Sequence, residues 1–183
     1  MSDARLRMLL HACCAPCSGP VIEQLVQEYQ VTLYFYNPNI HPRDEYIQRR
    51  NELVRWAHRN PEVDIVIADD DSRTWFEIIR GYEQEPEKGL RCTICYGMRL
   101  EKSAQYAAAH GYDIFTTTLS ISPHKDAERI NALGEDAASR SGVRFLQANF
   151  KKKGGFQRSL QISREMGFYR QHYCGCLYSM ERC

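Results

Sequence analysis

The fold class follows from one stretch near the start of the chain, Arg5-Leu6-Arg7-Met8-Leu9-Leu10-His11-Ala12-Cys13-Cys14-Ala15-Pro16-Cys17-Ser18, and from the segment after it. The short, largely apolar run Arg5–His11 predicts a buried β-strand. Apolar residues then recur every four positions in Gly19–Tyr29, which predicts a helix. We expect Ser18 to be its N-cap and Pro20 to lie in its first turn, where the missing N–H costs little.

The same alternation of short apolar segments and longer helical patterns continues along the chain. The predicted strands are Arg5–His11, Val31–Tyr36, Val63–Ala68, Tyr112–Leu119 and Val143–Ala148. The predicted helices are Gly19–Tyr29, Arg43–Arg59, Ser72–Gly81, Thr93–His110, Lys125–Ser141 and Phe156–Gly167. Because strand–helix alternation builds parallel sheets, we expect an α/β fold with a parallel sheet of about five strands and helices on both faces.

Length and composition narrow the class of protein. A chain of 183 residues is most simply one domain, 1–183, and is long enough to bury a core. The net charge of +1 gives no overall attraction to nucleic acid or membrane, so such binding would need a local patch. The apolar run Met8–Leu10 is too short to span a bilayer, and the first residues carry no signal-peptide pattern. We therefore expect a cytoplasmic protein without a membrane partner.

Eight cysteines stand out, and seven of them fall into three tight groups. The groups are Cys13-Cys14-Ala15-Pro16-Cys17, Cys92-Thr93-Ile94-Cys95 and Cys174-Gly175-Cys176. In a reducing cytosol, clustered cysteines indicate metal ligands or catalytic thiols rather than structural disulfides. The eighth, Cys183, has no close partner in the sequence and is interpreted as a bystander.

Each group has its own chemical preference. Cys92 and Cys95 lie three residues apart at a predicted helix start, which puts both sulfurs on one face and favours thiolates. The Cys174-Gly175-Cys176 group is the most redox-like, because glycine lets the sulfurs turn toward each other and so short a disulfide is easily reduced. Cys17 is either a further ligand or a helix-start thiol, and its exposure decides. The inventory suits an iron–sulfur cluster with a separate redox pair better than a zinc site.

The loops that follow the predicted strands are chemically unusual. These loops are His11–Ser18, Asn37–Pro42, Asp69–Asp71 and Ser120–Lys125. Sites in open α/β sheets form at the carboxyl ends of parallel strands, which meet at the same edge of the sheet. The sequence therefore predicts that all four loops, including the one with the first cysteine group, share that edge.

Five motifs lie in order over nearly the whole chain. They are Leu9–Ser18, Tyr36–Pro42 with Glu45-Tyr46, Arg91–Tyr96, Ser120–Lys125 and Tyr173–Ser179. Together they resemble the signature of the QueH family, the epoxyqueuosine reductases that are unrelated to the cobalamin-dependent ones. That family is similar in fold to Rossmann-like proteins of the HUP type, in which the loop after the first strand cradles pyrophosphate. Cysteines occupy this loop here, which argues against ATP chemistry.

The resemblance implies reduction of epoxyqueuosine to queuosine at the wobble position of tRNA. It also implies a [4Fe-4S] cluster, whose ligands map onto Cys13, Cys14, Cys92 and Cys95. Cys174 and Cys176 then match a redox-active pair. A competing assignment adds a mononuclear iron beside the cluster, held by one of Cys13 or Cys14, by Cys17 and by a C-terminal cysteine. Both assignments stay open, and the sequence does not identify the electron donor.

The C-terminal part of the chain carries candidates for RNA contact. The basic residues are Lys151, Lys152, Lys153 and Arg158, and aromatic side chains lie between further cations after them. Cations bind phosphate and aromatic rings stack on unpaired bases, so this run is expected to deliver RNA to the neighbouring Cys174-Gly175-Cys176 group. The segment 150–183 would thereby complete the site. A solvated charge run is the alternative.

Three polar residues are candidate proton donors for the reaction: His124, Lys125 and Tyr178. Each could equally be a helix-start or surface residue. Two further classes of function stay open, namely a zinc-stabilised RNA-binding protein without catalysis and a metal-free thiol–disulfide oxidoreductase. The colour of the purified protein separates them, because a cysteine-bound iron–sulfur cluster absorbs broadly near roughly 400 nm and zinc does not.

Overall fold

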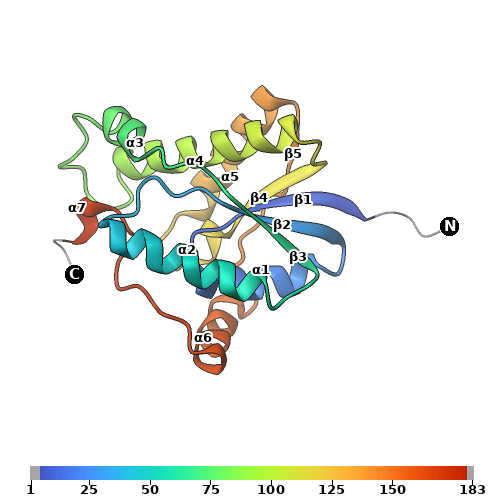
Figure 1. Cartoon of the computed structure of the whole chain (residues 1–183). Helices are drawn as coiled ribbons and strands as arrows, with labels where there is room; N and C mark the ends of the chain where they lie inside the picture. The colour runs from blue at the N-terminus through green and yellow to red at the C-terminus, as the bar shows by residue number, and fades with distance from the viewer. Residues whose placement is uncertain (1–4, 181–183) are drawn as a thin grey trace.

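Five parallel strands form one sheet in the computed structural model, which describes residues 5–180 of the chain (Figure 1). The strands are β1 (Leu6–His11), β2 (Tyr29–Phe35), β3 (Val63–Ile67), β4 (Ile114–Thr117) and β5 (Arg144–Phe145). Their order is β3-β2-β1-β4-β5, and each neighbouring pair is parallel. The α/β class and the five-stranded parallel sheet predicted from the sequence are thus confirmed.

The central strand β1 marks the point at which the chain changes direction across the sheet. From β1 the chain builds β2 and β3 on one side, and then crosses back to build β4 and β5 on the other. Leu9 of β1 is accordingly paired with Thr32 of β2 and with Phe115 of β4. The loops that leave β1 and β4 diverge at such a switch point and open a crevice, which is where sites form in this type of sheet.

Helices cover both faces of the sheet, because its inner strands are apolar on both sides (Figure 1). One face packs against α1 (Ala15–Leu25) and α2 (Arg43–Ala57), and α6 (Gly155–Met166) lies against α1. The other face packs against α4 (Leu90–Ala109) and α5 (Ala127–Ser141). Alternate residues of β1 serve the two layers: Met8 and Leu10 join the core under α1 and α2, whereas Leu9 joins the core under α4 and α5. Each is fully buried, and such burial contributes about 1.5–3 kcal/mol per side chain.

Helix α1 begins at Ala15, four residues earlier than the predicted Gly19, so the expectation of Ser18 as N-cap was wrong. Cys14 is extended and takes the N-cap position, and Pro16 is the first-turn proline. Ser18 lies inside the helix, where its Oγ donates to the Cys14 carbonyl at 2.8 Å. Pro20 therefore sits in the helix interior without an N–H. The Ser159 hydroxyl of α6 donates to the Pro16 carbonyl that this N–H would have served.

Other boundaries also moved. The predicted strand Tyr112–Leu119 ends at Thr117, because the chain tightens into the 3₁₀ helix η1 (Thr118–Ile121). The edge strand predicted at Val143–Ala148 is reduced to β5. Helix α4 starts at Leu90 rather than Thr93, which brings the second cysteine group within its first two turns. Two short helices complete the structure, α3 (Ser72–Ile78) and α7 (Leu177–Met180).

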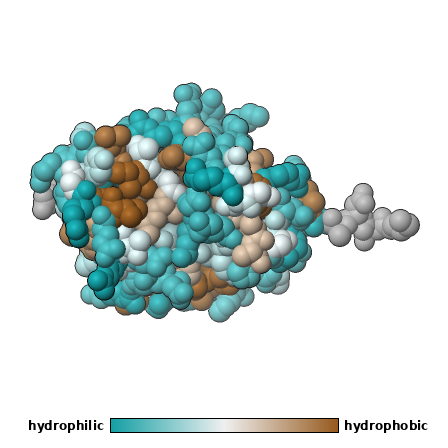
Figure 2. Space-filling model, turned by 90° about the horizontal axis from the view of Figure 1, so that it is seen from above, coloured by the Kyte–Doolittle hydropathy of each residue, from teal (hydrophilic) through white to brown (hydrophobic). Residues whose placement is uncertain are grey.

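The surface above α3 and α4 is mostly polar, with one distinct hydrophobic area toward the α3 end (Figure 2). Phe76 and Ile78 of α3 are among the exposed large apolar side chains, whereas Trp75 of the same helix is fully buried. Within residues 5–180, no helix combines the length and apolar character needed to cross a membrane.

Candidate active site

A cavity of about 310 Å³ lies at the carboxyl edge of the sheet, beside the switch point between β1 and β4. Its walls come from the loop after β1, the loop after η1, one face of α4, and the chain between α6 and α7. Cysteines from all three groups line it, namely Cys13, Cys17, Cys92 and Cys174. Because β1, β2, β3 and β4 are parallel, the four unusual loops that follow them share one edge, as predicted. Two hydrogen bonds join the loop after β1 to its neighbours. Asn37 donates to the Ala12 carbonyl, and the Cys13 N–H donates to Thr118.

The first cysteine group is a compact cluster of three sulfurs. The Sγ atoms of Cys13, Cys14 and Cys17 all lie within 4.8 Å of one another, and those of Cys13 and Cys14 are 3.7 Å apart. The extended backbone at Cys14 and the first turn of α1 bring the third sulfur back beside the other two. Polar side chains also reach these sulfurs, since Thr118 Oγ1 donates to Cys13 at 3.7 Å and Gln171 Nε2 donates to Cys14 at 3.3 Å. Such a cluster of thiols, with Cys13 and Cys14 buried and Cys17 half-buried, can hold a metal ion.

The pKa values of the three thiols are shifted in opposite directions. Hydrogen bonds from Cys14 and Cys17 hold the pKa of Cys13 well below its usual range. Donating to Cys13, together with burial, raises the pKa of Cys14 to about 12, and the same causes raise the pKa of Cys17. Hydrogen bonding within the group therefore favours a thiolate on one sulfur and thiols on the other two. A thiolate is the form of cysteine that binds a metal cation.

The second and third cysteine groups meet beside this cluster. Cys95 of α4 and Cys176 are buried in one apolar cluster with Trp75, and Cys174 packs against it. Burial, with a smaller contribution from the Cys174 thiolate, raises the pKa values of Cys92 and Cys95. Among residues 5–180, the group of three or more ligand atoms within 4.8 Å is the first one alone. The structure groups Cys14 with Cys13 and Cys17, and Cys95 with Cys176, so the predicted ligand set of Cys13, Cys14, Cys92 and Cys95 remains a prediction.

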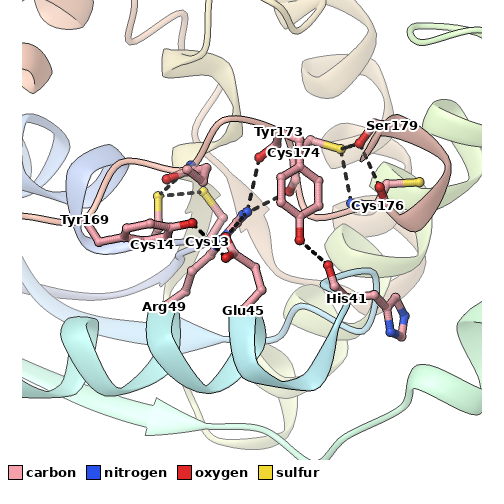
Figure 3. Close-up of polar contacts among 11 residues, drawn as sticks. Cys13, Cys14, His41, Glu45, Arg49, Tyr169, Tyr173, Cys174, Cys176 and Ser179 are labelled. Atoms are coloured by element: carbon pink, nitrogen blue, oxygen red, sulfur yellow. Dashed lines mark hydrogen bonds and ion pairs between the residues drawn. The ribbon is translucent and has the colours of Figure 1, made fainter. Parts of the chain in front are cut away.

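The Cys174-Gly175-Cys176 loop holds its two thiols close together and unlinked. The Cys176 N–H donates to Cys174 Sγ at 3.4 Å, and Ser179 Oγ lies 3.2 Å from the same sulfur (Figure 3). Hydrogen bonding from Cys176 holds the pKa of Cys174 well below its usual range and raises that of Cys176. Gly175 adopts φ +105°, and a Cβ there would lie 2.8 Å from Ile40 Cγ1, so only glycine fits.

Arg49 of α2 ties this loop to the body of the protein (Figure 3). Its guanidinium is buried and donates to the carbonyls of Tyr173 and Cys174 at 3.1 and 3.0 Å. Glu45, one helical turn earlier, balances the charge at 2.6 Å and accepts from the Tyr169 hydroxyl at 2.8 Å. Because charge-assisted hydrogen bonds in a buried site are strong, this network fixes the redox-like loop against the sheet edge.

The chain matches the protein-family model described as "Epoxyqueuosine reductase QueH" over residues 8–182. It belongs to the QueH family. Curated members named epoxyqueuosine reductase QueH agree with this. The one from Haemophilus influenzae is 46% identical over 98% of this chain and 74% of its own length. The one from Acinetobacter baylyi is 45% identical over 98% of this chain and 83% of its own. A more distant member, from Thermotoga maritima, is 35% identical over 94% of this chain and 90% of its own.

Two of the three candidate proton donors line the cavity, and the third does not. His124 is exposed and Lys125 half-buried, and both line the cavity. Tyr178 instead packs outside the lining, with its ring under the Arg91 guanidinium at 5.3 Å. Cys17 joins the first cysteine cluster. Cys183 lies outside the described residues.

Two of the four candidate RNA-binding residues, Lys151 and Arg158, contact other groups of the protein, and the other two are exposed. The Lys151 ammonium donates to the Lys125 carbonyl at 2.7 Å, so it braces the loop at the cavity mouth. Arg158 forms an ion pair with Glu23 at 2.6 Å on another part of the surface. The next two residues after Lys151, Lys152 and Lys153, are exposed.

Sequence reasoning assigned no role to several polar residues of the site: His11, Asn37, Arg49, Arg99 and Gln171. The spacing of Glu45 and Arg49 by one helical turn was a usable signal for an ion pair. His11 is fully buried, and burial together with the Arg99 charge lowers its pKa to about 3, so it is neutral. It lies 2.8 Å from Thr117 Oγ1 and 3.0 Å from the Tyr36 carbonyl, which joins the ends of three strands.

Proposed function

We propose that this protein is a reductase that converts epoxyqueuosine to queuosine in tRNA. The observation that carries the proposal is the convergence of all three cysteine groups on one cavity at the switch point of the sheet. Membership of a family whose curated members are named epoxyqueuosine reductase supplies the substrate. The wobble position of tRNA as the place of the nucleotide rests on the family resemblance.

The reaction requires a source of electrons and protons inside the cavity. An epoxide loses its oxygen to leave an alkene when it takes up two electrons and two protons, and the oxygen leaves as water. Oxidation of the Cys174 thiolate and the Cys176 thiol to a disulfide releases two electrons and one proton, and a proton donor of the cavity supplies the second proton of the turnover. An external reductant must then reduce the disulfide again. Its short loop makes that disulfide strained and readily reducible.

The residues present fit a thiolate-bound metal centre, which we propose to be a [4Fe-4S] cluster. The sulfurs of Cys13, Cys14 and Cys17 lie within 4.8 Å of one another, and Cys92 and Cys174 line the same cavity as Cys13 and Cys17. An iron–sulfur cluster supplies one-electron transfer, and an adjacent iron would supply a Lewis acid for the oxygen. Cys13, Cys14, Cys92 and Cys95 are the ligands proposed for the cluster. Cys17 is the ligand proposed for a second iron.

The other residues of the cavity position the substrate and provide protons. Lys125 and His124 stand at its mouth, within the lining, and are the proton donors we propose. Tyr178 is set aside for this role because it contacts Arg91 and Trp75 instead of the cavity. Asn37 and Arg49 hold the cysteine-bearing loops in place.

RNA would approach over the mouth of the cavity, where cationic or cation-forming side chains gather: Lys88, His124, Lys125, Arg170 and His172. Exposed Lys152 and Lys153 extend this face. Phosphate contacts from such side chains would hold the tRNA backbone while the modified base enters the cavity. Arg158 is not included, because Glu23 neutralises it.

The competing function, a zinc-stabilised RNA-binding protein, is separated from the reductase by one experiment on protein purified without oxygen. Iron, acid-labile sulfide and zinc are measured together with conversion of epoxyqueuosine-containing tRNA in the presence of a chemical reductant. The reductase requires iron, sulfide and turnover in the same sample. Stoichiometric zinc without iron or turnover would establish the binding protein instead.

A further inference from the structure

Arg99 is a buried cation at the centre of the cysteine site. It lies on α4 one turn beyond Cys95 and is 3% exposed. It lines the same cavity as Cys13 and Cys92. Arg99 therefore lines the cavity from the same helix as Cys92 and Cys95.

The Arg99 guanidinium forms a hydrogen bond to a neutral amide and lacks an anionic partner in the described chain. Nη2 donates to Asn37 Oδ1 at 2.5 Å, and Asn37 in turn donates to the Ala12 carbonyl at 2.9 Å, next to the first cysteine group. Nε is buried without a hydrogen-bond partner. Within the described chain, 5–180, no carboxylate forms an ion pair with this side chain. Burial of such a charge is unfavourable unless an anion compensates it.

The two other buried arginines near the site are placed differently. Arg49 has a carboxylate partner, Glu45, at 2.6 Å. Arg91 gives Nη1 to the carbonyls of Glu83 and Glu85 at 2.8 and 2.5 Å, and although its Nε and Nη2 lack a partner, it does not line the cavity. Arg99 alone of the three combines access to the cavity with the lack of a carboxylate or a set of carbonyls. An anion bound in the cavity would supply the partner that Arg99 lacks.

We propose that Arg99 is the counter-ion of the thiolate-bound centre and that its charge sets the reduction potential of that centre. This inference rests on the proposed function, which places a metal centre in the cavity. A metal bound by several thiolates keeps a net negative charge, and reduction makes that charge larger. A fixed positive charge in a low-dielectric site stabilises the reduced state more than the oxidised state, so it raises the potential. Arg99 is thus a positioning residue for electron transfer.

The test is a redox titration of the full chain purified without oxygen, followed by optical absorbance and electron paramagnetic resonance. Two variants remove the uncompensated charge. Arg99→Gln deletes it, and Asn37→Asp supplies the missing carboxylate in nearly the same volume. Arg99→Lys keeps the charge. Lys102→Gln is the matched control, because Lys102 lies on the same helix but is 45% exposed in its side chain and pairs with Asp71.

We expect Arg99→Gln and Asn37→Asp each to lower the ratio of reduced to oxidised centre at a fixed potential by about tenfold, which for a one-electron couple is a shift of about 59 mV. Arg99→Lys should keep most of the wild-type potential because it keeps the charge, and Lys102→Gln should leave the potential at the wild-type value. Iron-loaded variants with the wild-type potential would overturn the role of Arg99 while the proposed function stands. Wild-type protein without a redox-active metal would overturn both.

Discussion

Replacing Gly175 by alanine tests whether the redox loop depends on its close fit against the strand-edge loop. Gly175 has φ +105°, where an L-residue is strained by about 1–3 kcal/mol. Its new Cβ would also lie 2.8 Å from Ile40 Cγ1 and 3.3 Å from Ile40 Cα, and overpacking of this kind costs about 1–3 kcal/mol more. The two effects together should lower the free energy of unfolding by about 2–6 kcal/mol.

Gly167 provides the matched control. It has φ +64° at the end of α6, and nothing lies within 4 Å of the position that its Cβ would take. Gly167→Ala therefore meets backbone strain of about 1–2 kcal/mol without a clash. In a chain of this size 1 kcal/mol shifts Tm by about 2–4 °C, so Gly175→Ala should melt about 2–12 °C below Gly167→Ala.

Thermal melting followed by circular dichroism on anaerobic protein measures this difference, and epoxyqueuosine turnover is measured on the same samples. Gly175→Ala should lose turnover, because its strain is relieved by moving the Cys174 and Cys176 sulfurs. Gly167→Ala should keep it. Equal melting temperatures for the two variants would refute the claim that contact with Ile40 fixes the loop.

Three further predictions concern the metal centre and the RNA. Cys92→Ala should lower iron and acid-labile sulfide content, because it removes a proposed thiolate ligand from the cavity wall. Replacing Cys174 and Cys176 together by serine should abolish turnover while iron and sulfide are retained, since only the dithiol is removed. Reversing the charges of Lys152 and Lys153 to glutamate should weaken tRNA binding and reduce the slope of log K against log salt by about one for each phosphate that the protein no longer neutralises.

A specific result would contradict each of these three predictions. Full iron and sulfide in Cys92→Ala would remove Cys92 from the ligand set. Loss of iron from the Cys174 and Cys176 double variant would make one of them a metal ligand rather than a member of a redox pair, because serine is a poor ligand for iron. Unchanged tRNA affinity across a range of salt concentrations in the lysine variant would move the RNA surface to another face.

The sequence predicted the sheet well because its signal is local. The apolar runs Arg5–His11 and Val31–Tyr36 predict strands from their own composition, and the structure has strands at Leu6–His11 and Tyr29–Phe35. Strand–helix alternation then leaves few possible topologies. The start of α1 was misplaced because Ser18 and Pro20 have the composition of a helix start. The decisive feature, an extended Cys14 followed by Pro16, depends on where the cysteine loop packs.

The site was predictable in its chemistry but not in its grouping. Sequence spacing identifies each cysteine group, whereas only the fold places Cys95 beside Cys176 and gathers Cys17 with the first pair. The roles of Arg49 and Arg99 could not be predicted from the sequence. A lone arginine in a helix is most often solvent-exposed, and only tertiary packing shows that these two are buried at the ends of the cysteine loops.

The central claim is tested most directly by nucleoside mass spectrometry of tRNA that carries epoxyqueuosine, after incubation with anaerobically purified, iron-loaded protein and a reductant. The proposed function predicts that epoxyqueuosine disappears and that queuosine, lighter by one oxygen atom, appears in equal amount. An unchanged nucleoside in the presence of fully iron-loaded and fully reduced protein would contradict it.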